Sequence, residues 1–182
     1  MTGDEIADCF AAADECAPTL NSLYHINRRR PTQCKTGALD LINDIRFALP
    51  VDVIAERWAD TKKPVYRYVF DQPNPWQSSS RAHHANDLTL LFGGVDFSHN
   101  ANAMEIGRQF RESLIAFVHG SSPWPNGEIY AFGPLGRHGV LSRDEFSLRR
   151  RTACLEYFRE IGPAKMNAVF GRLAAGRISL LN

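Results

Sequence analysis

Two adjacent histidines, His83 and His84, lie on a Pro- and Ser-rich segment that follows an apolar run at residues 65–70. Asp87 comes shortly after them, and the dipeptide Phe92-Gly93 ends the next apolar run. Imidazole is the side chain whose unperturbed pKa lies nearest neutrality, and loops that follow strands commonly present general bases. The segment therefore predicts general acid/base chemistry at this histidine pair, which requires a nucleophile to deprotonate.

Other reactive chemistry is less well supported. Together with Asp87 and His99, the two histidines provide side chains of metal-ligating type, but adjacent side chains diverge and no standard zinc spacing is present, so no metal site is expected. The four cysteines show neither CxxC nor metal spacing, which favours free buried thiols and leaves a disulfide between two of them open. These cysteines are Cys9, Cys16, Cys34 and Cys154.

The remaining candidate groups have no clear partner in the sequence. Ser78–Ser80 are typical of a flexible loop, and Ser121–Ser122 are expected at a helix end, without the sharp turn that exposes a nucleophilic serine. Three further histidines are expected at the surface: His25, His119 and His138.

Composition indicates a globular protein. With 182 residues, 44% of them hydrophobic, the chain is the size of one domain and can bury a real core. Its net charge of +1 argues against nucleic acid or an anionic membrane as a partner, and the basic runs Arg28–Arg30 and Arg149–Arg151 are expected on solvated faces. No apolar run is long enough for a membrane span, and no secretory leader is evident, which leaves localisation open.

Helical periodicity covers the first third of the chain. Thr2 and Glu5 match a capping box, so a helix is expected to begin directly after Thr2. A second short helix is expected at residues 18–26. Apolar stripes at 38–49 and 51–58 predict two more helices, with Pro50 at the first position of the second.

Strand signals are few. Residues 65–70 are rich in β-branched and aromatic side chains and predict a buried strand, and 129–132 is a weaker candidate. Amphipathic helices are expected at 106–117, ending in the turn at 120–123, and at 146–161 and 164–173. Because a strand needs neighbours to pair its backbone groups, so few strands indicate either a piece of a larger sheet protein or strands that the pattern does not reveal.

Three segments, in order, resemble one family. Residues 38–50 form a helix pattern with a central Asp and a closing Pro, 64–71 contain the apolar strand, and 84–93 read His, small residue, any residue, acid, apolar run, Phe-Gly. This set resembles the C-terminal third of type-B carboxylesterases, the α/β-hydrolase family that includes cholinesterases and many fungal esterases and lipases. Looser similarity extends over 110–124 and over 132–150, which resembles the tail of fungal members.

The resemblance implies an α/β fold class. Residues 1–182 would be an incomplete domain, the C-terminal part of an α/β-hydrolase fold, helix-rich with one or two sheet strands and with the sheet core missing. The catalytic histidine would be His84, because Asp87 and Phe92-Gly93 set the register, and His83 would be non-catalytic. Asp87 would cap the following helix or order the loop. Ala85 departs from the glycine common in the family and would be strained if its φ is positive.

The family's other catalytic parts are absent from this sequence. The triad of this fold runs Ser, acid, His along the chain, with the serine in a G-x-S-x-G elbow, and neither that elbow nor a Gly-rich oxyanion loop occurs here. The acidic residues of the first helix lack the expected acid-Gly context: Asp4, Glu5, Asp8, Asp14 and Glu15.

Two interpretations of function follow from this absence. One is a fragment of a carboxylic-ester hydrolase that carries the histidine, acts on small-molecule esters only when complete, is inactive alone, needs no cofactor, and has the missing N-terminal portion of its own fold as a partner. The alternative is a non-catalytic remnant or interaction module.

Overall fold

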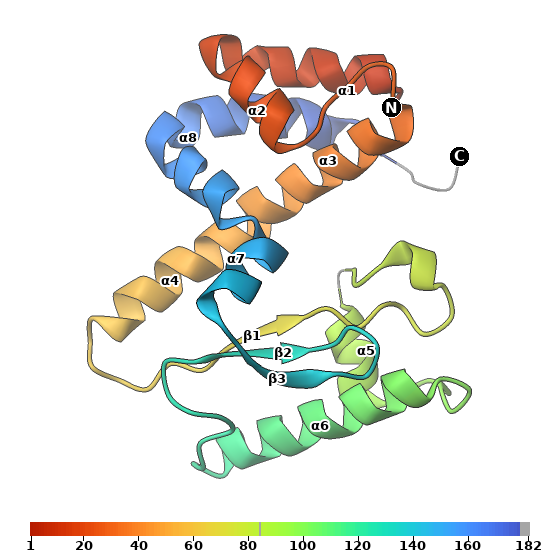
Figure 1. Ribbon diagram of the computed structural model, residues 1–182, viewed down its shortest axis with the longest axis vertical. Helices are drawn as coiled ribbons and strands as arrows, with labels where there is room; N and C mark the ends of the chain where they lie inside the picture. The colour runs from red at the N-terminus through yellow and green to blue at the C-terminus, as the bar shows by residue number, and fades with distance from the viewer. Residues whose placement is uncertain (84, 179–182) are drawn as a thin grey trace. The chain divides into compact units, whose positions relative to one another are not determined.

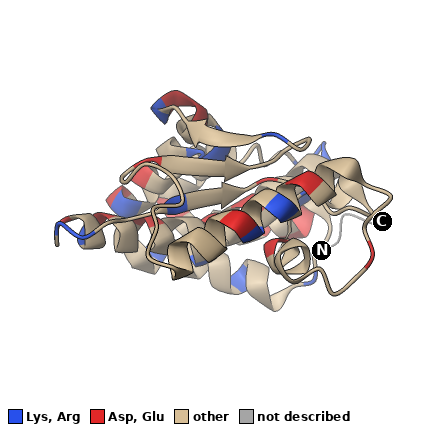
Figure 2. Ribbon diagram, turned by 90° about the horizontal axis from the view of Figure 1, so that it is seen from below, with Lys and Arg blue, Asp and Glu red and all other residues tan. Residues whose placement is uncertain are grey.

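The computed structural model describes residues 1–83 and 85–178. The chain divides into two compact units. The helical unit comprises Met1–Ile54 and Ser147–Asn182, and the sheet unit comprises Ala55–Phe146. Figure 2 shows acidic and basic residues interleaved along the ribbon, in keeping with the near-zero net charge. None of the helices in the described ranges is both long and apolar enough to cross a membrane.

The first helix, α1 (Gly3–Phe10), begins as predicted. Thr2 Oγ1 accepts from the Glu5 amide at 3.2 Å, and Glu5 Oε2 accepts from the Thr2 amide at 2.7 Å, so the capping box satisfies two N–H groups reciprocally. A 3₁₀ segment (Ala11–Cys16) leads into α2 (Ala17–Leu23). The predicted second helix ends before residue 26, because His25 adopts a left-handed backbone with φ of 54°.

Helices α3 (Pro31–Asn43) and α4 (Leu49–Ala59) are joined by a π-helical turn at Asp44–Ala48. Pro50 was predicted to be the first residue of the second of these helices, but α4 begins one residue earlier, at Leu49. Proline lacks an N–H, and its ring clashes with the carbonyl four residues earlier. The wider π turn, in which the Leu49 amide donates to the Asp44 carbonyl, lets the chain continue as a helix through this position.

The C-terminal helices are α7 (Arg143–Arg150) and α8 (Thr152–Ala175). The single helix predicted at 146–161 is therefore wrong, because Arg151 adopts φ 47° and ψ 51° and ends α7. Gly162, with φ of 78°, and Pro163 interrupt α8 where the sequence predicts a boundary between two helices. Figure 1 shows α1, α2, α3 and α8 packed together in the helical unit.

The core of the helical unit is apolar with a central aromatic group. The Tyr24 ring centroid lies 6.2 Å from that of Phe10 and 5.9 Å from that of Phe158, within the range of favourable ring pairs. All four cysteines are free, as expected, and Cys16 alone among them is only partly buried.

The sheet unit contains three strands in the order β1-β2-β3: β1 (Arg67–Phe70), β2 (Ile129–Phe132) and β3 (His138–Leu141). Strands β1 and β2 are parallel, and β2 and β3 are antiparallel. The expectation of one or two strands missed β3, a short His-Gly-Val-Leu segment with little strand pattern. Because β2 supplies a ladder, β1 is paired rather than orphaned. It is also less buried than predicted, since Tyr68 is 42% exposed.

Helices α5 (Asn86–Phe92) and α6 (Ala101–Val118) cover one face of this sheet (Figure 1). The ring of Phe110 on α6 lies 4.9 Å from Phe132 and 5.5 Å from Phe70, between ring centroids. Val69, Ala131 and Leu141 form a smaller cluster on the opposite face. The prediction of a long amphipathic helix over 106–117 is confirmed.

Candidate functional site

The histidine segment is the connection between β1 and α5. Its first residues are bound to the end of β2, because the amides of Asp71 and Gln72 both donate to the Phe132 carbonyl, at 2.8 and 3.1 Å. The side chain of Gln72 is buried, and its Oε1 accepts from the Gly136 amide at 3.1 Å. Gln72, at the start of the loop, is therefore fixed both through its backbone amide and through its side chain.

The end of the loop is bound to its start. Asn86, the first residue of α5, is 1% exposed, and its Nδ2 donates to the Gln72 carbonyl at 2.7 Å. The Asn86 amide also donates to the His83 carbonyl at 3.1 Å. A buried amide side chain needs hydrogen-bond partners to offset its desolvation. The Asn86 side chain meets this need by bonding to Gln72, and the bond holds the two ends of the loop together.

Asn74 organises the interior of the loop and holds His83. Its Oδ1 accepts from the amides of Trp76 and Gln77, at 2.8 and 3.0 Å, and its own amide donates to the Arg81 carbonyl at 3.0 Å. These two donors identify the amide oxygen, so Nδ2 is the group that lies 2.8 Å from His83 Nε2. Nε2 therefore accepts, and the ring proton of His83 lies on Nδ1.

A second attachment binds the loop to the start of α6. The Pro75 carbonyl lies 3.3 Å from both Asn100 Nδ2 and His99 Nε2. Asn100 also caps α6, since its Oδ1 accepts from the Ala103 amide at 3.0 Å. His83 and His99 therefore bind different partners.

The predicted catalytic residue, His84, lies outside the described residues. Within the described ranges, no cluster of three metal-ligating side chains is found.

Two strained residues flank position 84 in the chain. Arg81 has φ 58° and ψ −163°, and Ala85 has φ 64° and ψ 10°. Ala85 was expected to be strained if its φ is positive, and its φ is positive. It lies in the left-handed region, where the Cβ of a residue other than glycine costs about 1–2 kcal/mol. Such strain persists only where surrounding contacts determine the backbone, which the bonds of Asn74 and Asn86 do here.

Asp87 does not cap α5, contrary to one of the roles predicted for it. The residue before α5 is Ala85, which has no capping side chain, and Asp87 lies in the first turn of the helix. Its Oδ2 is 3.5 Å from the Tyr68 hydroxyl. The pKa of Tyr68 is raised, first by burial and then by the nearby Asp87 charge. The carboxylate therefore connects the start of α5 to β1.

The serines considered as nucleophiles lie in different surroundings. Ser78–Ser80 form a single 3₁₀ turn in the histidine loop, more ordered than the flexible loop predicted. The Ser122 hydroxyl lies 2.7 Å from the Tyr66 hydroxyl, after the end of α6. The Ser122 hydroxyl therefore has a phenol rather than an imidazole as its partner.

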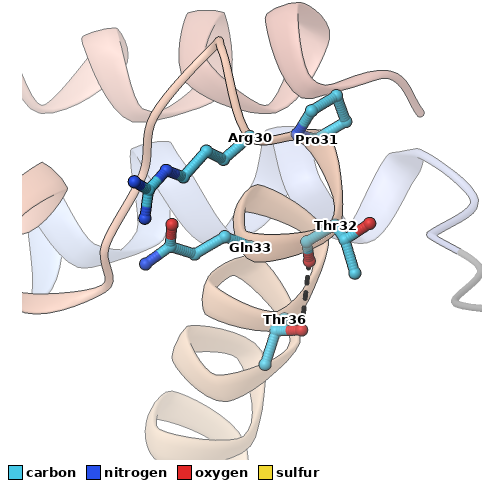
Figure 3. Close-up of a pocket in the computed structure, with 5 residues that line it drawn as sticks. All are labelled: Arg30, Pro31, Thr32, Gln33 and Thr36. Atoms are coloured by element: carbon cyan, nitrogen blue, oxygen red, sulfur yellow. Dashed lines mark hydrogen bonds between the residues drawn. The ribbon is translucent and has the colours of Figure 1, made fainter.

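An open hollow on the helical unit lies at the start of α3 (Figure 3). Thr36 Oγ1 donates to the Thr32 carbonyl at 3.1 Å within it. The lining side chains include no nucleophile–base pair, so this hollow offers no site for hydrolysis. They are Arg30, Pro31, Thr32, Gln33 and Thr36.

The solvated faces predicted for the basic runs are confirmed for one run and wrong for part of the other. Arg28 forms exposed ion pairs with Asp4 and Asp8. Arg151 instead binds the fully buried Asp44, through Nη2 at 2.7 Å and Nε at 3.1 Å. The Tyr24 hydroxyl donates to the same carboxylate at 2.9 Å. Sequence patterns miss this cluster because its partners are 107 residues apart.

A helix-rich chain with a small mixed sheet, in which a strand runs into a clamped histidine loop, is consistent with part of an α/β-hydrolase domain. The model of the carboxylesterase family matches residues 4–137. The chain belongs to the carboxylesterase family, as the resemblance indicated.

Curated relatives are lipases and carboxylesterases. Lipase 3 of Yarrowia lipolytica is 25% identical over 148 residues, which cover 70% of this chain and 29% of that protein. Lipase 1 of the same yeast is 29% identical over 94 residues, or 52% and 19% of the two chains. Carboxylesterase 5A of Felis catus is 32% identical over 77 residues, or 40% and 14%. The chain thus spans less than a third of each relative, and no solved structure matches it.

Proposed function

We propose that this chain is the C-terminal part of a carboxylic-ester hydrolase and that His84 is the general acid/base of the complete enzyme. Family membership supports ester hydrolysis as the reaction class. The alignment of His84, Asp87 and Phe92-Gly93 with the family pattern supports the choice of histidine.

The observation that carries the proposal is the clamped loop. A general base must be held within hydrogen-bond reach of the proton that it takes. The Asn86–Gln72 bond joins the two ends of the loop, and Asn74 organises its interior. His83 is engaged by Asn74 inside the loop, which favours its neighbour for a role toward substrate.

The chemistry assigned to His84 is proton transfer. In a Ser-acid-His hydrolase the imidazole takes the proton of the serine as the serine attacks the ester carbonyl. It then gives a proton to the departing alcohol, while backbone N–H donors stabilise the tetrahedral oxyanion. In this proposal the serine, the acid and the oxyanion donors come from an N-terminal portion of the same fold.

The sheet offers a place for that portion. Within the described residues, the order β1-β2-β3 places β1 at one end of the sheet, which is where a further strand can be added. Parallel sheets are ordinarily buried on both faces and continue over several strands. We infer that strands of the N-terminal portion extend the sheet from β1.

The test begins with the DNA upstream of the Met1 codon. We expect an in-frame segment that encodes a G-x-S-x-G elbow and an acid motif. The extended protein should hydrolyse p-nitrophenyl esters, and His84→Ala should lower kcat by about 10³-fold or more, as loss of a triad member does. His83→Ala serves as the matched control and should change kcat less than tenfold.

Two results would contradict this function. Full activity in the extended His84→Ala protein would show that another residue is the base. Stop codons throughout the upstream region would instead favour the non-catalytic remnant for this locus. The 182-residue chain alone should show no ester turnover that depends on His84.

A further inference from the structure

A second group of reactive side chains lies in the sheet unit, away from the histidine loop in sequence. His138 Nδ1 is 2.8 Å from the Tyr130 hydroxyl, and His138 Nε2 is 3.4 Å from Glu105 Oε1. The sequence predicts no partner for His138. The structure gives it two, one on each ring nitrogen, from β2 and from α6.

Sheet register places the tyrosine beside the histidine. Tyr130 pairs with Val140 and Phe132 pairs with His138, so Tyr130 and His138 are diagonal neighbours on the same face. The Trp124 ring also stacks on the Tyr130 ring, with 5.1 Å between the ring centroids. Helix α6 packs on this face and brings Glu105 to the far side of the imidazole.

The network determines which atom carries each proton. Arg108 binds Glu105 through Nη2 at 2.7 Å, and this hydrogen bond lowers the pKa of Glu105. An ionised carboxylate only accepts, so in the neutral imidazole of His138 the Nε2 that faces it carries the ring proton. Nδ1 is then an acceptor, and the Tyr130 hydroxyl donates to it. Burial raises the pKa of Tyr130, so its hydroxyl stays protonated near neutral pH and needs a base to react.

We propose that Tyr130 is a nucleophile activated by His138 and Glu105, and that it accepts an acyl group from activated aryl esters. A nucleophile within hydrogen-bond reach of a base, with the base oriented by a third group, is the arrangement that covalent catalysis requires. The cluster of Tyr130, His138 and Glu105 is open to solvent, because the side chains of His138 and Glu105 are 28% and 39% exposed.

The step balances as a simple acyl transfer. Tyr130 Oη forms a bond to the acyl carbon, and the bond from that carbon to the aryl oxygen breaks. The phenolic proton passes to His138 Nδ1, the electron pair leaves with the aryl oxide, and Glu105 stabilises the imidazolium. The imidazolium then releases the proton to the aryl oxide or to solvent, so the products are an O-acyl tyrosine and the free phenol or its anion.

The test uses the 182-residue chain and p-nitrophenyl acetate near neutral pH. We expect a burst of one equivalent of p-nitrophenolate, and mass spectrometry of a digest should place the acetyl group on Tyr130. His138→Gln should slow this acylation about 100-fold or more, the usual size of a general-base contribution. Glu105→Gln should lower the rate less, because it removes only the orienting charge.

Controls separate reactivity from folding. Tyr130→Phe keeps the ring and should remove the burst while leaving the thermal melting midpoint near that of the parent chain. Tyr66→Phe removes a hydroxyl that is bonded to Ser122 rather than to a histidine, and it should leave the burst unchanged. Acylation confined to other residues, or an unchanged rate in folded His138→Gln, would overturn the proposal. Either result would leave the role proposed for His84 untouched, since that role is measured in the extended protein.

Discussion

Asn86 Nδ2 donates to the Gln72 carbonyl at 2.7 Å, and both residues are almost completely buried. This single contact joins the end of β1 to the start of α5 and closes the loop that contains both adjacent histidines. Gln72 is held in turn by the Phe132 carbonyl and, through its side chain, by the Gly136 amide. The position of the histidine loop therefore depends on the β2–β3 hairpin.

The Asn86 contact should be measurable as stability. Asn86→Ala leaves the buried Gln72 carbonyl without this donor, and we expect a loss of about 1–3 kcal/mol in the free energy of unfolding. Urea denaturation followed by circular dichroism measures it. Gln77→Ala, an exposed residue of the same loop, is the control and should change stability by less than about 0.5 kcal/mol. Equal effects of the two variants would show that Asn86 does not clamp the loop.

Ala85→Gly should stabilise the protein. Glycine removes the strain at φ 64°, about 1–2 kcal/mol, and costs about 0.4–1 kcal/mol through the freer unfolded chain. The middles of these two ranges, about 1.5 and about 0.7 kcal/mol, give an expected net gain of about 0.8 kcal/mol, read from urea denaturation midpoints. Ala82→Gly, three residues earlier and outside the left-handed region, should instead lose about 0.4–1 kcal/mol. A loss in both variants would contradict a strained Ala85.

Gly133 marks the closest approach of the β2–β3 hairpin to the loop. A Cβ at this position would lie 2.3 Å from the Gln72 amide nitrogen, and its φ is 95°. Gly133→Ala should cost about 3 kcal/mol or more, since a backbone clash adds to the left-handed strain. Gly127 also has a positive φ, of 84°, but a Cβ there would meet no atom within 4 Å. Gly127→Ala should therefore cost only the left-handed backbone strain, about 1–2 kcal/mol. Thermal denaturation of the two variants compares these costs, and equal losses would argue against the close approach.

The Asp44–Arg151 pair should be costly to break from one side. Arg151→Met leaves the fully buried Asp44 carboxylate without its charge partner, and we expect a loss of about 3–5 kcal/mol in chemical denaturation. Arg28→Met removes two exposed ion pairs, which solvent screens, and should therefore cost far less stability than Arg151→Met. If Arg151→Met behaved like Arg28→Met, Arg151 would not be serving as the partner of a buried charge.

Stability should fall in alkali. The pKa of Tyr24 is raised from its ordinary value of 10.0, first by burial and then by the Asp44 charge. The folded protein therefore keeps this proton at a pH where the unfolded chain releases it, so the contribution is complete below pH 10.0 and declines above it. Each such group adds up to about 1.4 kcal/mol per pH unit to the slope.

Urea denaturation at pH 9 to 11 tests this slope. Cys154 acts in the same direction from its ordinary value of 9.0, because burial raises its pKa as well. Tyr24→Phe should flatten the decline above pH 10.0 by up to about 1.4 kcal/mol per pH unit. An unchanged slope in that variant would mean that Tyr24 ionises equally in both states.

Local signals predicted several elements well. Thr2 and Glu5 form the capping box as expected, because that motif joins residues three positions apart and needs no tertiary contact. The stripe through Ile106 and Phe110 predicted α6, since an amphipathic period requires only one apolar face to pack. The strand before the histidines was predicted from its β-branched and aromatic side chains, which are also a local signal, although the ladder with β2 extends only over Arg67–Phe70.

The family and most helices were thus predicted by the sequence, because motif spacing and periodicity are local properties of the chain. Tertiary structure alone decided that β3 exists, that Asn86 binds Gln72, that Asp44 binds Arg151, and that Tyr130 and Glu105 meet His138. Each of these contacts depends on strand register or on a buried polar group finding a distant partner. Such pairing follows from packing and desolvation, and neither leaves a period in the sequence.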